Sequence, residues 1–528
     1  MRKKLLCLVV TINLFIAASF FISNIGVGYS RLSSDLHNII PMCIKFDQPE
    51  LFKNDLYLND LDNFKYYTPF FIQTLRFFSK LTNGDYLLSL NIISFIAHII
   101  YGLSWFFLCY ILFKKKFWLA LILSILLRGI IWLPGYEIWG ISDIWSIMPR
   151  TVYAALFPIP FVFLFLNKKY HLLISSFLIG FIFNFHPISG LGGMLLFVVL
   201  LFCLHLFSIK KYTVKQFLFA FVLMVLGALP FVLTYFGKTE SLAQYDLTLY
   251  QEAFNSRIPH YFSDPIAFIK KWVSFKILFF CIPLLSYVCY AFFWKKEERK
   301  KASILLLLTI SLIIIPSISV YVENSINEMF STNIRMAFQI IRVQKLAIVP
   351  SYFALGFLVL ILIDSYPKVN KLMPALTMFY LVVIIFSNCF IFNNVPFVSD
   401  DITRGIYPNI SDVFKSRNEK LNDFDTMALY INENTPKDAV FYGSYMIRSA
   451  SKRSVVFDKK GASILIEGNP EAFINWRQDM KKIKHLIEDK KIDFLKDNGV
   501  NYILSPKNNF DDKLLIKTIG KQHLYKIQ

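Results

Sequence analysis

Long apolar runs alternate with short polar turns from residue 5 to residue 393. A helix needs about 20 residues to cross the hydrocarbon core of a bilayer, and most of these runs approach that length. There are eleven of them, near 5–27, 87–113, 117–134, 151–166, 171–185, 190–208, 215–236, 273–293, 302–321, 345–363 and 372–393. The pattern predicts a polytopic α-helical membrane protein with about 11 transmembrane helices.

The basic residues in the turns predict how these helices are oriented. If the N-terminus lies in the cytoplasm, then Lys114–Lys116 and the KKEERKK run at 295–301 fall on the cytoplasmic side, as do most other basic turns. Cytoplasmic loops carry the excess of Lys and Arg in membrane proteins. We therefore expect an integral protein of the inner (cytoplasmic) membrane, whose long loop 28–86 and C-terminal part lie outside the cytoplasm.

The chain changes character after residue 393. DFDTMALYINENTPKDAVFYG has the pattern of a helix, a turn and a strand, and RSVVFD, VNYILSP and HLYKI have the pattern of further strands. The segment 471–499 predicts one or two helices. Alternating helices and strands indicate a small α/β domain. We thus predict a membrane domain at 1–393, including loop 28–86, and an extracytoplasmic α/β domain at 394–528.

The composition supports the membrane class and narrows the partners. The chain has 528 residues, of which 55% are hydrophobic, and a formal net charge of +20. Because most basic residues lie in turns between apolar runs, we expect membrane lipids and no nucleic acid as partners. Six of the seven cysteines lie in apolar runs and no CxxC pair occurs, which argues against a disulfide framework or a zinc site.

Loop 28–86 holds the first candidate for chemistry. Its stretch SSDLHNIIPMCIKFDQPELFKNDLY places Asp35 and His37 directly after the first apolar run, followed by Asp55. An acid beside a histidine suits a general base or a metal ligand, whereas Asp35 could equally start a helix as its cap. Further on, Asp60 and Asp62 have a spacing that can chelate a divalent ion, although solvated loop charge explains them better.

Several basic and polar residues fall on the predicted outer side, against the usual distribution of charge. Arg150 enters the membrane from the outer face, and Arg335, Gln339 and Arg342 share one face of a helix at i, i+4 and i+7. Arginine suits a phosphate because its planar fork pairs with two oxygens. Binding of bulk anionic headgroups is the alternative. His186 lies in the outer turn FHPISGLGG, where a structural role and a ligand role both remain open.

The arrangement resembles the GT-C superfamily of integral membrane glycosyltransferases. Asp35 matches the acid that these enzymes carry in their first long outer loop, and Arg342 with its neighbours matches the late outer loop that binds the carrier phosphate. A poorly characterised bacterial GT-C-like subgroup with a C-terminal extracytoplasmic α/β domain is similar in loop 28–86 and in the tail. The tail residues that carry this likeness are Thr435, Pro436, Lys437, Asp438, Ala439, Phe441, Arg448, Arg453, Asp458, Lys459, Trp476 and Arg477.

The resemblance implies a function outside the cytoplasm. It implies transfer of a sugar from a polyprenyl-phosphate-linked donor to a glycan or lipid acceptor of the cell envelope, with a divalent cation (Mg or Mn) as the conceivable cofactor. Asp35 and His37 would be catalytic, and Asp55, Arg150, His186, Arg335, Gln339 and Arg342 would bind substrate or carrier. Two alternatives stay open: a polymerase or ligase that uses an undecaprenyl-pyrophosphate-linked glycan, and a non-catalytic membrane scaffold or transporter.

Overall fold

The computed structural model describes most of the chain and divides it into two compact units. Unit 1 comprises Met1–Ser23, Ile92–Pro230 and His260–Phe414, and unit 2 comprises Asn24–Asn91, Phe231–Pro259 and Lys415–Gln528. The residues that the structure describes are 3–130, 147–166, 170–237, 245–273, 275–330, 334, 336–386, 403, 405–415 and 420–528.

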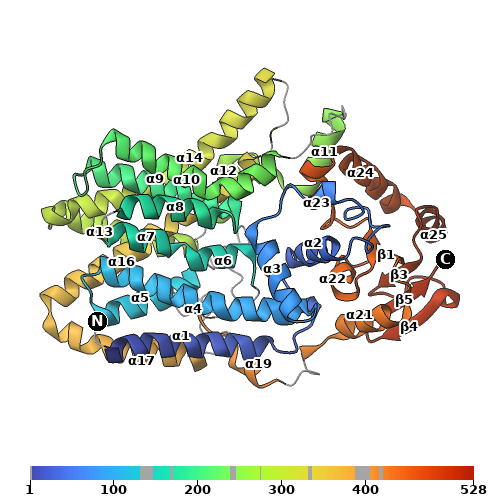
Figure 1. The fold of residues 1–528 in the computed structure, drawn as a ribbon, viewed down its shortest axis with the longest axis horizontal. Helices are drawn as coiled ribbons and strands as arrows, with labels where there is room; N and C mark the ends of the chain where they lie inside the picture. The colour runs from blue at the N-terminus through green and yellow to red at the C-terminus, as the bar shows by residue number, and fades with distance from the viewer. Residues whose placement is uncertain are drawn as a thin grey trace. The chain divides into compact units, whose positions relative to one another are not determined.

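Unit 1 consists of helices (Figure 1). The residue ranges of three of them run a few residues past the bounds of the unit. Its α-helices are α1 (Lys3–Asn24), α4 (Tyr86–Leu112), α5 (Phe117–Ile130), α6 (Pro149–Leu156), α7 (Pro158–Phe165), α8 (His171–Phe183), α9 (Pro187–Leu206), α10 (Val214–Phe236), α12 (Pro265–Trp272), α13 (Phe275–Phe293), α14 (Arg299–Phe330), α15 (Ala337–Ile340), α16 (Val349–Ser365), α17 (Pro367–Phe386) and α19 (Ile410–Phe414). Short 3₁₀ helices are η4 (His260–Phe262), η5 (Lys296–Glu298) and η6 (Ile341–Ile348).

The described helices confirm the predicted fold class. Seven of them are long and apolar enough to cross a membrane, and four shorter apolar helices accompany these seven. Together they coincide with the eleven runs that the sequence predicts. The chain is an integral membrane protein, and the predicted orientation of its helices stays a prediction.

Two kinds of contact hold unit 1 together. Apolar side chains of α13, α14 and α16 form a buried cluster around Tyr287 and Ala354. Elsewhere a buried polar contact joins α1, α4 and α5, because Nη2 of Arg128 donates to Oδ1 of Asn13 at 2.5 Å and to the carbonyl oxygen of His98 at 2.8 Å. A buried guanidinium needs such acceptors, since an unpaired polar group in an apolar interior is costly.

Unit 2 contains helices and one five-stranded sheet. Its helices are η1 (Tyr29–Arg31), α2 (Leu36–Asp47), η2 (Leu61–Asn63), α3 (Phe70–Leu81), α11 (Leu247–Arg257), α21 (Asp423–Asn434), α22 (Ile447–Ser451), α23 (Ala462–Gly468), α24 (Pro470–His485), α25 (Glu488–Asp497) and η7 (Asp512–Leu514). Its strands are β1 (Val440–Tyr442), β2 (Ser454–Val456), β3 (Tyr502–Ser505), β4 (Leu515–Ile519) and β5 (Gln522–Lys526). The predicted α/β domain is therefore present.

The sheet mixes parallel and antiparallel pairs in the order β2-β1-β3-β5-β4. β1 runs parallel to β2 and β3, whereas β5 runs antiparallel to β3 and β4. Successive side chains of a strand point to opposite faces. Phe441, Val455 and Leu504 accordingly pack with α21 on one face, and Val440, Val456 and Ile503 pack with α24 and α25 on the other. The sheet thus lies between two helical layers.

The loop after α1 is built into the same unit as the sheet. α2 packs against α22, η1 packs against α21, and η2 packs against α23. At one of these contacts Asp425, which belongs to the capping box that starts α21, also accepts hydrogen bonds from the backbone nitrogen and hydroxyl of Ser30. The domain limits 1–393 and 394–528 stay a prediction, and the contacts of loop 28–86 with the tail are an observation that the sequence did not suggest.

The two faces of β4 and β5 offer a direct test of the sheet. Leu524 of β5 is fully buried against α21, whereas Ile516 of β4 is exposed. We expect Leu524→Ala to lower the free energy of unfolding of unit 2 by about 2–5 kcal/mol, because it leaves a cavity. The matched control Ile516→Ala should change it by less than about 0.5 kcal/mol. Thermal unfolding of the full chain in detergent, followed by near-ultraviolet circular dichroism, measures both; equal effects would contradict the assignment of faces.

Candidate functional site

Asp35 stands at the start of α2, and its side chain does not act as the cap. The backbone carbonyl of Asp35 accepts from the amides of Asn38 and Ile39, both at 3.1 Å, but its carboxylate makes no capping hydrogen bond. Instead the carboxylate forms an ion pair with Nζ of Lys460. The side chain of Asp35 remains 42% exposed. An acid in this position can meet a substrate from solution.

Lys460 reaches Asp35 from the loop between β2 and α23. The backbone of this loop is fixed from two other segments: Nδ2 of Asn38 donates to the carbonyl of Lys460 at 3.0 Å, and Nε of Arg257 donates to the carbonyl of Lys459 at 2.8 Å. The glycine at 461 is required, since a Cβ there would lie 2.5 Å from the ring of Tyr57. These contacts hold Lys460 next to the N-terminus of α2.

Arg257 at the end of α11 brings a second positive charge to this place. Burial lowers the pKa of its guanidinium, and the negative charges of Asp35 and Asp458 oppose that effect, so both acids lie near it. Asp35, Lys460 and Arg257, which we call the Asp35 cluster, therefore combine one exposed carboxylate with two cations. Such a set can accept a proton at the carboxylate and hold a phosphate with the cations.

His37 lies in the interior of unit 2. Only 1% of it is exposed, and its Nδ1 lies 2.6 Å from Oγ of Ser449. The Ser449 hydroxyl donates to the carbonyl of Met446, so its oxygen accepts the hydrogen bond from the N–H group at Nδ1 of His37. Burial and the positive charge of Lys460 lower the pKa of His37 to about 4. His37 is therefore neutral at physiological pH and anchors α2 to α22.

Asp55 is buried in an ion cluster with a second acid. Its Oδ2 accepts from Nε of Arg448 at 2.7 Å and from the amide of Val455 at 2.9 Å, and its Oδ1 accepts from the amides of Tyr57 and Leu58. The same guanidinium also pairs with Asp458. Burial alone would lower the pKa of Arg448, but Asp458 and Asp55 raise it. Arg448, Asp55 and Asp458 form what we call the Arg448 network.

In unit 1 two of the three residues that are predicted to share one helix face are in contact. Nη1 of Arg342 donates to Oε1 of Gln339 at 2.8 Å, and its guanidinium lies 4.6 Å from the ring centre of Phe262. Gln339 belongs to α15 and Arg342 to the 3₁₀ helix η6 that follows it, and their spacing of three residues places them on one face. Arg335 lies outside the described residues.

Two further basic residues of unit 1, Arg150 and the buried Lys345, are coupled electrostatically to this region. Arg150 is the second residue of α6, and Nη2 contacts Sδ of Met148 at 3.2 Å. The charges of Arg150 and Arg342 both act on Lys345, a buried residue of η6. Arg150 and Arg342 thus act on the same buried residue of unit 1, and these two arginines are the groups that could bind an anion there.

His186 has a structural contact in unit 1. It is the N-cap of α9, where its Nδ1 accepts from the amide of Ser189 at 3.1 Å. Residues 131–146, which precede α6, lie outside the residues that the structure describes. Among the residues that the structure describes, no group of three or more His, Cys, Asp and Glu side chains could hold a metal ion. The donor set around Asp35 therefore does not fit a resident cation by itself, and we derive no step through one.

Sequence reasoning missed two members of the Asp35 cluster. Lys460 and Arg257 are far from Asp35 in sequence, and neither lies in a pattern that marks a site. The only local signal was the run VVFDKKG, where two lysines follow a buried strand and precede a glycine. That run can be identified as a loop from its composition, but not as the partner of loop 28–86.

Comparison with solved structures finds proteins of similar fold, whereas comparison of sequences finds no match. ArnT from Cupriavidus metallidurans in the apo state has a TM-score of 0.50 and 11% identity, over 98% of this chain and 97% of that chain. The structure of the same enzyme bound to undecaprenyl phosphate gives 0.50 and 11%, over 100% and 99%. ArnT is a GT-C glycosyltransferase. This chain therefore has the fold of ArnT, which is the kind of fold that the resemblance predicted.

A third similar structure adds no argument. The oligosaccharyltransferase of Archaeoglobus fulgidus has a TM-score of 0.49 and 11% identity, over 96% of this chain and 69% of that chain. No protein-family model matches the chain, and no curated protein sequence matches it.

The burial of His37 predicts how stability depends on pH. Since the pKa of His37 is lower in the folded chain than in the unfolded chain, the unfolded state binds more protons below pH 6.5, and stability falls as the pH drops from 6.5 towards 4. We expect His37→Gln to remove on the order of 2 kcal/mol of this loss at pH 5. Thermal unfolding of both proteins at pH 7.5 and pH 5 tests this. His485→Gln, on the exposed end of α24, should leave the pH dependence unchanged.

Proposed function

We propose that the chain is a membrane glycosyltransferase that moves a sugar from a polyprenyl-phosphate carrier to a glycan or lipid acceptor of the cell envelope, on the extracytoplasmic face. The observation that carries the proposal is the Asp35 cluster, in which an exposed acid pairs with Lys460 beside Arg257. The fold supports it, since ArnT has been crystallised with undecaprenyl phosphate.

In this proposal Asp35 is the general base. Its carboxylate takes the proton of an acceptor hydroxyl while the hydroxyl oxygen forms a bond to the anomeric carbon of the donor sugar. The bond between that carbon and the carrier phosphate breaks, and the electron pair stays on the phosphate oxygen. Lys460 pairs with Asp35 in the structure; a phosphate offers this lysine a second partner, which releases the carboxylate to accept the proton.

The cations of unit 1 are proposed to hold the carrier. Arg342, kept in place by Gln339 and Phe262, and Arg150 would bind its phosphate by charge-assisted hydrogen bonds. Arg335 retains this role from the sequence alone. His186 would act through the start of α9, and His37 and Asp55 would act indirectly by fixing α2 and loop 28–86.

A comparison of two acids in the same loop tests the proposal. We expect Asp35→Asn to lower sugar transfer by about 100-fold or more, because a general base typically contributes that much. Asp62→Asn is the matched control, since Asp62 is exposed and pairs only with Lys65 at 2.5 Å among the described residues. Each variant is expressed in a deletion strain, its amount is checked by immunoblot, and polyprenyl-linked sugars and surface glycan are compared by mass spectrometry.

The outcomes separate the competing functions. Accumulation of the lipid-linked donor with Asp35→Asn, together with a glycan that lacks one sugar, supports the proposal and identifies the sugar. If Asp35→Asn matches wild type while Arg342→Ala and His186→Ala abolish the glycan, a polymerase or ligase of whole oligosaccharides replaces it. Unchanged glycan and lipid in the deletion strain itself would point to a scaffold or transporter.

A further inference from the structure

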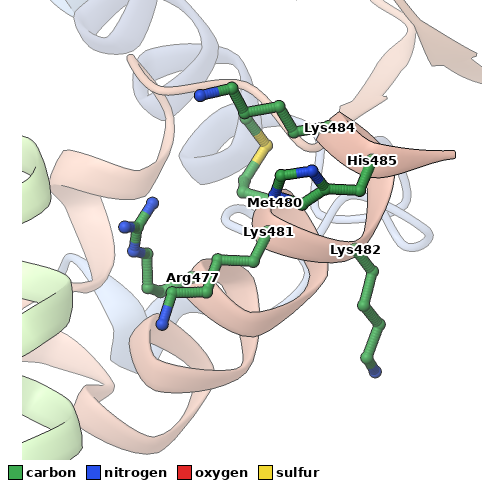
Figure 2. Close-up of a pocket in the computed structure, with 6 residues that line it drawn as sticks. All are labelled: Arg477, Met480, Lys481, Lys482, Lys484 and His485. Atoms are coloured by element: carbon green, nitrogen blue, oxygen red, sulfur yellow. The ribbon is translucent and has the colours of Figure 1, made fainter.

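The second half of α24 carries positive charge in excess. Between residues 477 and 485 the sequence RQDMKKIKH holds four Lys or Arg residues and a histidine against one acid, Asp479. Figure 2 shows six residues of this helix that line a hollow, among them the four Lys and Arg residues and the histidine. The hollow has a volume of about 490 Å³ and is lined by Arg477, Met480, Lys481, Lys482, Lys484 and His485. Five of the six lining residues are basic and none is acidic, and we call this set the α24 hollow.

The acids nearby do not balance these charges. Glu252 of α11 is shared by Arg477, at 3.7 Å, and by Lys481. Asp479 pairs with Lys482 at 3.2 Å. Within the part of the chain that the structure describes, Lys484 and His485 make no ion pair. The α24 hollow therefore keeps a net positive charge that solvent, salt or a ligand must neutralise.

Helix stability explains only part of this pattern. Basic residues in the last turn of a helix interact favourably with its free carbonyl groups, which accounts for Lys482, Lys484 and His485. Arg477 and Lys481 lie before or at the edge of that turn. Together with Lys484 they are spaced at i, i+4 and i+7, which places three cations on one face along about 10 Å of helix.

The surroundings favour a polymer over a membrane. A helix that lies on a bilayer inserts an apolar face below its charged face. In α24 the large apolar side chains are buried within unit 2, namely Phe473, Ile474, Trp476 and Ile483. The face that remains is basic and exposed to solvent, with the side chain of Lys482 62% exposed. Such a face suits a chain with repeated negative charges better than a single small anion, because each weak contact adds to the others.

We propose that the α24 hollow is a docking surface for a phosphodiester-linked envelope polymer, which would be the acceptor of the transfer reaction. The identity of this polymer as acceptor rests on the proposed function. Binding of the polyanion itself rests only on the charge and shape of the hollow. The two parts can therefore fail separately.

A binding experiment on the full-length protein in neutral nanodiscs tests the surface. The ligand is a fluorescent short poly(glycerol phosphate), and neutral dextran of similar length is the uncharged control. We expect Lys481→Gln, Lys482→Gln and Lys484→Gln combined to weaken binding at low salt at least tenfold and to reduce its dependence on salt. The matched control combines Lys513→Gln, Lys517→Gln and Lys521→Gln, three exposed lysines of the same unit, and should stay within twofold of wild type.

Further outcomes decide between the explanations. Asp35→Asn should bind the polymer like wild type, which separates docking from chemistry; if it binds normally but also transfers sugar normally, the proposed function fails and the docking surface stands. Equal loss in both lysine triples would show general charge attraction and overturn the proposal. So would wild-type binding to phosphatidylglycerol vesicles but not to the polymer, or equal affinity for dextran.

Discussion

Arg448 is a buried cation on which the arrangement of unit 2 depends. Its guanidinium binds Asp55 from loop 28–86 and Asp458 from the loop after β2, and lies 4.7 Å from the ring centre of Tyr57. Removing charges from water costs several kcal/mol per ion, and this cost is offset only when the partners meet in good geometry. Neither loop 28–86 nor the sheet can leave the network without exposing or orphaning a charge. The network therefore forces two distant parts of the chain to fold as one unit.

The same network sets the surroundings of Asp35. Asp458 fixes the turn that follows it by accepting from the amide of Gly461 at 2.5 Å, and this turn carries Lys460. Ser449, next to Arg448, is hydrogen-bonded to His37 of α2. Asp35 therefore belongs to a helix that is anchored by these contacts, and Lys460 forms an ion pair with it. Precise placement of a base and of charge-stabilising groups is what group transfer requires of a protein, and this makes the network part of the functional proposal as well as of the fold.

Local patterns predicted the elements well and their association poorly. The strands VNYILSP and RSVVFD were evident because buried β-formers are bounded by turn residues, and the helix at 423–434 was evident from its amphipathic pattern. β4 was missed because most of its side chains are exposed, which leaves no alternation. The pairing of Asp35 with Lys460 joins residues 425 positions apart, and no periodicity reports such a contact. In unit 1 the contact of Gln339 with Arg342 joins residues three apart, a spacing that the helical pattern of the sequence already places on one face.

Hydrogen exchange in the full-length chain measures the coupling most directly. Arg448→Lys keeps the charge but removes the fork that reaches two carboxylates. The account predicts faster exchange, to a similar degree, in two separate segments: the amides of Tyr57 and Leu58, which bind Asp55, and those of Val455 and Gly461, which bind Asp55 and Asp458. Exchange of β5 should change little. If only the segment around Val455 opened while Tyr57 and Leu58 kept wild-type protection, loop 28–86 would be held by other contacts and the central role of Arg448 would be contradicted.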